Sequence, residues 1–181
     1  MNLLDITLFP WINAAAGTPA WQIGLATFVS DHLPACMLLV LAVLKIWRPE
    51  ERRVLWTALS SLLVTWLIVR LVRDTWSLPR PAALDLGIQW VEHATRGGFP
   101  SLHASGAFAV AMVLVFERRD LLALLFVLAA AAVAWSRVYL GVHFPTDVLA
   151  GAALGSLVAL LAQGASHWRR RPAGRVRRAL P

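Results

Sequence analysis

Long apolar segments separated by short charged ones restrict the fold of this 181-residue chain more than any other feature. Several fall short of the ~20 residues that a lone membrane-spanning helix needs, but each can be extended through flanking residues. A soluble bundle would leave too little polar sequence to cover its exterior, because hydrophobic residues make up 59% of the chain. The sequence therefore predicts an all-α fold, a polytopic membrane bundle of five to six helices. The clearest apolar segments are 33–47, 54–72, 104–116, 121–135 and 148–162.

The placement of lysine and arginine predicts how this bundle is oriented. Twelve of the seventeen basic residues lie from the end of the first apolar segment to the second, between the third and fourth, or after the fifth. Such residues concentrate on the cytoplasmic side of a membrane. We therefore expect a multi-pass protein of the bacterial cytoplasmic (inner) membrane, whose opposite helix ends face the periplasm or cell exterior. The net charge of +7 then reflects topology and contact with anionic lipid, and no nucleic acid partner is expected.

The chain divides into an expected membrane-embedded domain, residues 1–165, and a basic cytoplasmic tail, residues 166–181. A single cysteine, Cys36, excludes an intramolecular disulfide and a four-thiolate zinc site. No cleavable signal peptide is expected, because the N-terminus lacks a basic region and Asp5 interrupts its first apolar stretch.

The first fifty residues predict two helices. A short amphipathic helix is expected within 1–16 at the outer interface, followed by a break at 17–19. One helix over 19–47 would then be about 43 Å long. It would carry Asp31 and His32 near the outer interface, either as the rim of a site or, the favoured interpretation, as ordinary interfacial residues.

Three polar segments at the outer helix ends hold nearly all the polar residues that topology leaves unexplained. They are 73–81, 99–104 and 136–147. Hairpin connections between successive spans bring all three to one face of the membrane. The arginines among them suit phosphate, because guanidinium groups bind phosphate oxygens in a fork geometry and stay charged near an apolar wall.

Local patterns in the last two segments favour phosphoryl chemistry. Ser101 is a candidate N-cap, and the free N–H groups of the turn after it would point at an anion. An aspartate four residues after a histidine, as Asp147 follows His143, can accept the Nδ1 hydrogen bond and leave Nε2 free to attack phosphorus. A second histidine, His103, would protonate the departing oxygen.

These segments resemble the signature of the type-2 phosphatidic acid phosphatase superfamily, which includes bacterial undecaprenyl-diphosphate phosphatases and vanadium haloperoxidases. The family pattern is K-x6-R-P, then P-S-G-H, then S-R-x5-H-x3-D, and the resemblance covers roughly residues 50–165. The matching segments here are Arg73-x6-Arg80-Pro81, Pro100-Ser101-Leu102-His103 and Ser136-Arg137-x5-His143-x3-Asp147.

The resemblance implies a role for each matched residue. His143 would form a phosphohistidine, Asp147 would orient it, and His103 would be the general acid. No metal or other cofactor would be needed. The phosphate would be held by Arg73, Arg80, Ser101, Leu102 and Arg137.

Two positions depart from the family pattern. Arg73 stands where the family usually has lysine, which keeps the charge but changes its geometry. Leu102 replaces a glycine; its N–H remains available to phosphate, and a helix start needs no positive φ.

The run 136–147 looks most like that of the undecaprenyl-diphosphate phosphatases, which implies a lipid phosphate substrate within the bilayer. Phosphatidylglycerophosphate, phosphatidate and lipid A phosphate are alternative substrates, and a second lipid is an alternative phosphoryl acceptor. Other classes remain open: a lipid transporter or binding protein with a non-catalytic site, or a metallohydrolase that uses His103, His143 and Asp147 as ligands. The sequence sets no oligomeric state.

Two further features carry weaker expectations. The loop over 74–99 is long for a membrane hairpin and suggests a lid or recognition element, with Trp76 and Trp90 as candidate substrate contacts. Gly151 and Gly155 form a G-x3-G pair that favours close helix packing within the subunit over a dimer face.

Overall fold

The computed structural model describes residues 3–49, 52–94 and 97–168, and the regular structure within these ranges is helical, without a β-strand. The expected all-α membrane bundle is confirmed, with seven α-helices in the described residues where five to six were expected, because the stretch 19–47 forms two helices instead of one. The helices are α1 (Leu3–Ile12), α2 (Ala20–Asp31), α3 (Leu33–Trp47), α4 (Arg52–Thr75), α5 (Leu102–Glu117), α6 (Leu121–Tyr139) and α7 (Pro145–Trp168).

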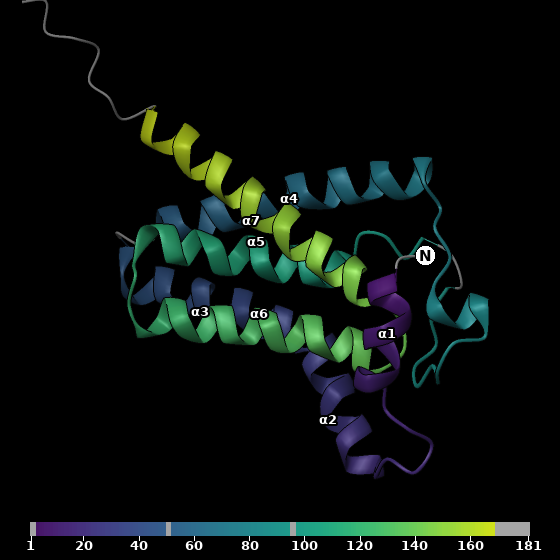
Figure 1. The fold of residues 1–181 in the computed structure, drawn as a ribbon. Coiled ribbons are helices and arrows are strands. Elements are labelled where there is room, and N and C mark those ends of the chain that lie inside the picture. The colour runs from purple at the N-terminus through teal and green to yellow at the C-terminus, as the bar shows by residue number, and fades with distance from the viewer. Residues whose placement is uncertain (1–2, 50–51, 95–96, 169–181) are drawn as a thin grey trace, which may run out of the picture.

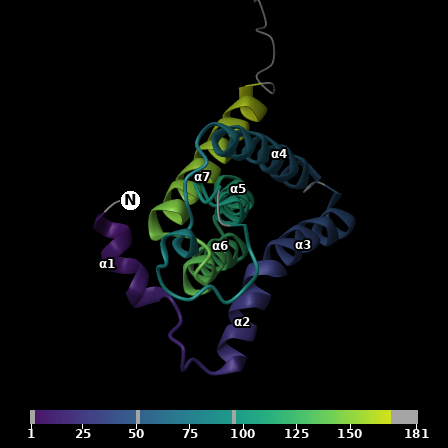
Figure 2. The same ribbon diagram turned by 90° about the vertical axis from the view of Figure 1, so that its right-hand side faces the viewer.

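Three helices, α4, α6 and α7, are long and apolar enough to cross a membrane, and the bent pair α2 and α3 makes a fourth candidate span. The segment expected as the third span forms α5, which has only 16 residues. Figure 2 shows α5 at the centre of the bundle, surrounded by α4, α6 and α7. Its short length suits this position, because its neighbours cover most of its surface.

The expected single helix over 19–47 is wrong, since the chain bends by 46° between α2 and α3. The break falls at His32, and Pro34 lies in the first turn of α3. A proline lacks the N–H that a continuous helix would use and clashes with the preceding turn, so it favours a new helix start. The bend leaves α2 packed against α6, and the end of α2 lies near the polar segments.

The G-x3-G pair of α7 packs against α5, which confirms the expected close packing within the subunit. A Cβ added at Gly155 would lie 2.1 Å from the backbone oxygen of Ser105, and one at Gly151 would lie 2.7 Å from that of Ser101. Neither position has room for a side chain. The two glycines therefore set the distance between α5 and α7, the helices that begin nearest the two candidate histidines.

The N-terminal segment forms the expected short helix and break. Helix α1 lies across the ends of α6 and α7 (Figure 1), and its contacts are with these two helices. The expected basic tail, 166–181, is described only as far as 168, so its arginines lie outside the described residues. Arg96, in the long loop, also lies outside them.

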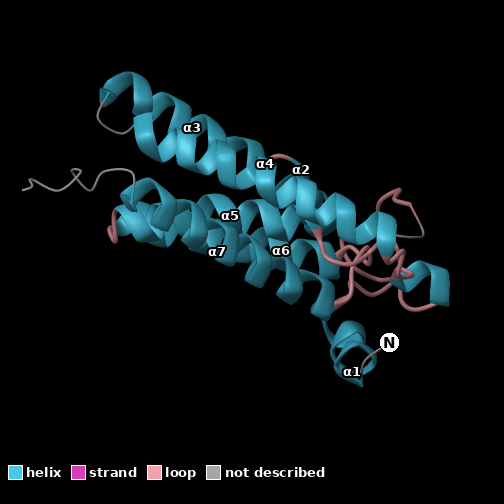
Figure 3. Ribbon diagram, turned by 90° about the horizontal axis from the view of Figure 1, so that it is seen from above, coloured by secondary structure: helices cyan, strands magenta, loops and turns pink. Residues whose placement is uncertain are grey.

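The long loop after α4 folds over the end of the bundle where α1 lies (Figure 3). It contains one turn of 3-10 helix, η2 (Pro81–Leu84). Asn13 anchors it: the Asn13 side chain donates to the oxygens of Ile88 (2.9 Å) and Tyr139 (3.1 Å) and accepts from the N–H of Ile88 (2.7 Å). The Trp90 indole donates to the oxygen of Ala14 at 3.0 Å. These bonds join the loop to α1 and α6.

Candidate active site

The three polar segments meet where the loops gather at one end of the bundle (Figure 3). His143, in the last of these segments, is almost fully buried. Its Nδ1 lies 3.2 Å from Oδ2 of Asp147, and its Nε2 lies 3.1 Å from Nη1 of Arg80. A guanidinium group can only donate hydrogen bonds, so Nε2 must accept. The imidazole proton therefore sits on Nδ1, facing the carboxylate, and the lone pair sits on Nε2.

The surroundings of His143 keep its ring uncharged. Burial lowers the pKa of His143 well below its usual range, and the positive charges of Arg80, Arg137 and Arg73 lower this pKa further. A protonated ring would have no lone pair on Nε2. The neutral form is the one that can act as a nucleophile, so this environment favours that form.

Asp147 joins the second and third polar segments. Its Oδ2 accepts from His143 and also from the backbone N–H of Phe144 at 2.9 Å. Its backbone oxygen accepts from the N–H of Ser101 at 3.0 Å. The start of α5 and the start of α7 are thereby fixed to each other.

Two arginines reach the site from α4 and the loop after it. Arg80 is almost fully buried and donates to the backbone oxygens of Val142 (2.7 Å) and Gly97 (3.2 Å). Burial, followed by the charges of Arg73 and Arg137, lowers the pKa of Arg80 to about 10, so it stays charged at neutral pH. Arg73 donates twice to the oxygen of Pro100, at 3.1 and 2.7 Å.

The third arginine, Arg137, is held by groups from two other elements. It donates to the hydroxyl of Ser30, its Nη1 lies 3.9 Å from Oδ1 of Asp31, and its Nη2 lies 3.2 Å from Nε2 of His93. Asp31 therefore lies beside Arg137, which favours the interpretation of Asp31 as the rim of the candidate site over that of an ordinary interfacial residue. The exposed His32 instead packs its ring against Phe28.

Ser30 and His93 are site residues that the sequence did not identify. The rings of His93 and His143 lie 6.3 Å apart at a steep angle. No local motif marks either residue, since each is brought in by tertiary structure: Ser30 by the bend after α2, and His93 by the anchored loop. The only sequence signal was a histidine in a long loop beside the predicted site.

Ser101 and Leu102 lie where the pattern predicted, at the start of α5. Ser101 is fully buried, and its hydroxyl forms no hydrogen bond with the described residues. Leu102 is helical with a negative φ, so the side chain in place of glycine causes no backbone strain.

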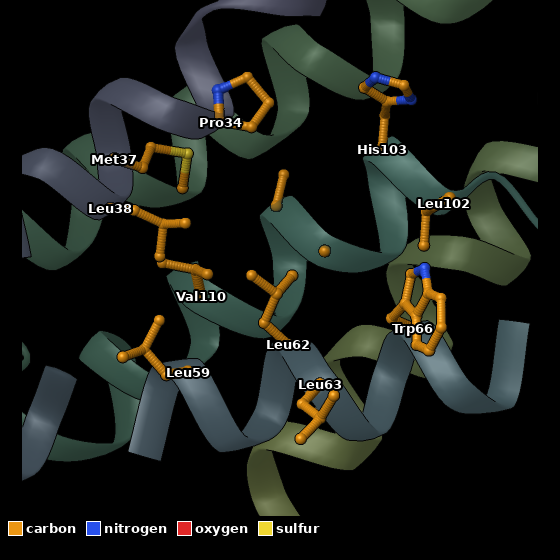
Figure 4. A pocket seen from close by; sticks show the side chains of 12 residues that line it. Pro34, Met37, Leu38, Leu59, Leu62, Leu63, Trp66, Leu102, His103 and Val110 are labelled. Atoms are coloured by element: carbon orange, nitrogen blue, oxygen red, sulfur yellow. The ribbon is translucent and has the colours of Figure 1, made fainter. Parts of the chain in front are cut away.

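His103 lies between the charged side chains of the candidate site and an apolar groove. It interacts electrostatically with Arg137, Arg73 and Asp31. Its ring also lines a groove of about 460 Å³ (Figure 4). The groove runs between α3, α4 and α5, and its other lining residues are Pro34, Met37, Leu38, Leu59, Leu62, Leu63, Trp66, Leu102, Gly106, Ala107 and Val110.

The described residues include no group of three or more histidine, cysteine, aspartate or glutamate side chains placed to hold a metal ion. His143 and Asp147 instead bind each other and the residues around them. Of the two tryptophans expected to contact substrate, Trp90 serves to anchor the loop, while Trp76 is 63% exposed beyond the end of α4.

Comparison with known proteins agrees with this geometry. The family model described as "PAP2 superfamily" matches residues 54–171. YbjG of Escherichia coli (strain K12), provisionally named an undecaprenyl-diphosphatase, is 33% identical over 165 residues, 88% of this chain and 81% of YbjG. The undecaprenyl-diphosphatase BcrC of Bacillus subtilis (strain 168) is 28% identical over 76% of this chain and 68% of its own. The crystal structure of Aquifex aeolicus LpxE superposes with a TM-score of 0.76 at 25% identity, covering 91% of this chain and 99% of LpxE.

Proposed function

Because this chain belongs to the PAP2 superfamily of membrane phosphatases, we propose that it hydrolyses a lipid diphosphate through a phosphohistidine at His143. Undecaprenyl diphosphate is the proposed substrate and undecaprenyl phosphate the product. Similarity to YbjG and BcrC over most of the chain supports this choice. Phosphatidylglycerophosphate, phosphatidate and lipid A phosphate are the alternative substrates.

One observation carries the proposal: the arrangement of both ring nitrogens of His143. Nδ1 faces Asp147 at 3.2 Å, and Nε2 faces Arg80 at 3.1 Å. A carboxylate thus fixes the ring, while the unprotonated Nε2 accepts from Arg80, the group that would hold a phosphate oxygen. This is the arrangement that a nucleophilic histidine needs.

In the proposed first step, Nε2 of His143 attacks the terminal phosphorus. The N–P bond forms as the P–O bond to the lipid phosphate breaks, and His103 protonates the departing oxygen. Arg73, Arg80 and Arg137 bind the equatorial oxygens, where they stabilise charge in the transition state. Asp147 stabilises the ring as it becomes cationic.

In the second step, water attacks the phosphohistidine from the side that the lipid has left. His103, now neutral, accepts a proton from this water, and the N–P bond breaks. Inorganic phosphate leaves, and His143 returns to its starting form. The chain's own side chains supply every proton transfer in this scheme, so we expect activity without a metal ion.

The groove beside His103 gives the substrate's chain a path from the bilayer to the site. Its lining is apolar apart from His103 itself, with Met37 from α3, Leu62 from α4 and Val110 from α5 among the side chains around it (Figure 4). A lipid chain in the groove would place its phosphate-bearing end at His103 and its leaving oxygen next to the general acid.

The orientation of the site follows from the charges at the other end of the bundle. There Arg53 pairs with Glu117 at 2.9 Å and donates to Ser166 at 2.8 Å, so α4, α5 and α7 are joined where the basic segments lie. With that end in the cytoplasm, the site faces the periplasm or the cell exterior.

The test is phosphate release by purified protein from each candidate lipid, with wild type compared to His143→Ala. Loss of turnover with retained lipid binding supports the proposal. His32→Ala is the matched control, because it is the same substitution at an exposed histidine. Vanadate should inhibit the wild type and chelators should not. A wild-type protein that binds lipid phosphates without hydrolysing them would instead establish a binding or transport function.

A further inference from the structure

One face of α1 contacts the segment that carries His143. Asp5, Phe9 and Asn13 follow one another at four-residue spacing, and Asn13 continues the helical pattern by donating its N–H to the oxygen of Phe9 at 2.9 Å. Residues at this spacing share one helical face. In Figure 1 this helix lies across the end of α6 and the start of α7. His143 lies in the chain between these two helices.

Asp5 binds the first turn of α7 through two hydrogen bonds. Its Oδ1 accepts from the backbone N–H of Thr146 at 3.0 Å, and its Oδ2 accepts from the Thr146 hydroxyl at 2.6 Å. Asp5 is only 4% exposed. A carboxylate is costly to bury beside apolar groups unless it is well hydrogen-bonded, so this residue is held for a specific contact.

The contact caps a helix that begins without a cap of its own. The first N–H groups of a helix need acceptors from outside it. Phe144, which precedes α7, has no side chain that can accept. Asp147 takes the N–H of Phe144 and Asp5 takes that of Thr146, so α1 supplies part of the cap from a distant point in the sequence.

Two more residues of this face of α1 contact the segment between α6 and α7, one on each side of His143. Phe9 is buried against Phe144, with ring centroids 5.5 Å apart. Asn13 donates to the oxygen of Tyr139, at the end of α6. The stretch with His143 is therefore fastened to α1 both before and after the histidine.

We propose that Asp5 is a positioning residue: through Thr146 it fixes the first turn of α7, and so holds Asp147 where it orients His143 for attack on phosphorus. The inference rests on the proposed phosphatase function. The family match begins at residue 54, so α1 lies outside it. The N-terminal helix thus completes a site whose reacting groups all lie within the matched region.

The test compares Asp5→Ala, Thr146→Val and the double variant in the full chain. Removing the contact should lower kcat about tenfold and change KM less than about twofold, because misplacing a nucleophile affects the chemical step more than binding. The rate of phosphohistidine formation in a single turnover should fall by the same factor. Thr146→Val removes only the hydroxyl bond and leaves the bond from its backbone N–H to Asp5, so its loss should be no larger than that of Asp5→Ala. The double variant should lose no more than Asp5→Ala alone, since that change already removes both bonds.

Two controls separate positioning from a general effect on the fold. Thr146→Ser keeps the hydroxyl and should retain wild-type kcat. Thr7→Val makes the threonine substitution on the exposed face of α1, where the hydroxyl binds only Leu3, and should also leave kcat unchanged. All assays run well below the lowest Tm of the set; if Asp5→Ala does not fold, Asp5→Asn replaces it, with a smaller expected loss.

The outcomes are distinct. Wild-type turnover that needs His143 but is unchanged in Asp5→Ala and Thr146→Val overturns the positioning role and leaves the proposed function intact. A lower Tm with unchanged kcat overturns it equally, because the contact would then be only structural. Absence of turnover in the wild type overturns the proposed function, and this inference with it.

Discussion

Two hydrogen-bonding neighbours determine which ring nitrogen of His143 carries the lone pair that would react in the proposed mechanism. Asp147 fixes the proton on one side of the ring, and Arg80 occupies the lone pair on the other. A phosphate entering the site would replace Nε2 as the acceptor of the Arg80 hydrogen bond. Its phosphorus would then lie next to Nε2. In the proposed mechanism, Arg80 would therefore bind the Nε2 lone pair before substrate enters and a phosphate oxygen of the substrate afterwards.

Changing the carboxylate next to His143 should affect catalysis more than binding. In Asp147→Asn the amide cannot stabilise the imidazolium that forms when phosphorus is attacked, so kcat should fall about 100-fold or more with little change in KM. The measurement is steady-state phosphate release. Asp85→Asn is the matched control: Asp85 is exposed with φ 55°, a conformation that asparagine also adopts, and its variant should behave as wild type.

His93 should make the stability of the protein depend on pH. Burial, followed by the charges of Arg80, Arg137 and Arg73, lowers the pKa of His93 to about 4. The unfolded chain binds this proton near pH 6.5. The unfolded state therefore holds more protons between these values, and the stabilisation present above pH 6.5 is lost as the pH falls toward 4.

Thermal unfolding in detergent at pH 7 and pH 5 measures this effect. The wild type should have the lower Tm at pH 5, and His93→Gln should reduce the difference. The same substitution at the exposed His32 should leave the difference as in wild type. An unchanged difference in His93→Gln would show that His93 does not respond to pH in this way.

Among the helices, the pair α5 and α7 has the most direct effect on the site, because the starts of both helices carry its residues. Their separation depends on Gly155, where a Cβ would lie 2.1 Å from a backbone oxygen. Gly155→Ala should therefore force the helices apart and destabilise the protein by about 1–3 kcal/mol, as overpacking does. Gly164→Ala, on the same helix with nothing within 4 Å, should be neutral or slightly stabilising. Equal Tm values for the two variants would contradict this account.

The sequence was sufficient to predict those elements that depend on local pattern. Apolar segments located the helices of the bundle, and the spacing of His143 and Asp147 predicted their contact because His143 directly precedes a helix start and Asp147 lies in the first turn. The bend at His32 was missed although Pro34 was visible, since apolar length alone favoured one helix. The roles of Ser30, His93 and Asp5 depend on distant segments meeting, for which a single sequence gives no signal.

At the scale of the whole molecule, the proposed catalytic site and the basic segments lie at opposite ends of the bundle. Asp85 directly follows η2, in the loop at the end of the proposed site, and Arg48 directly follows α3 at the other end of the bundle. With Cys36 changed to serine, a single cysteine at position 85 should react with a membrane-impermeant thiol reagent added to spheroplasts. A single cysteine at position 48 should react only after the membrane is opened. The reverse pattern would place the site in the cytoplasm.

The most direct measurement of the central claim is to trap the covalent intermediate. Protein mixed with lipid diphosphate labelled in its terminal phosphate is quenched in base within one turnover, and the labelled residue is located by mass spectrometry. The account predicts a phosphoryl group on Nε2 of His143, stable in base and lost in acid, and absent from His143→Ala. An active protein that carries no label, or carries it on His93 or His103, would contradict it.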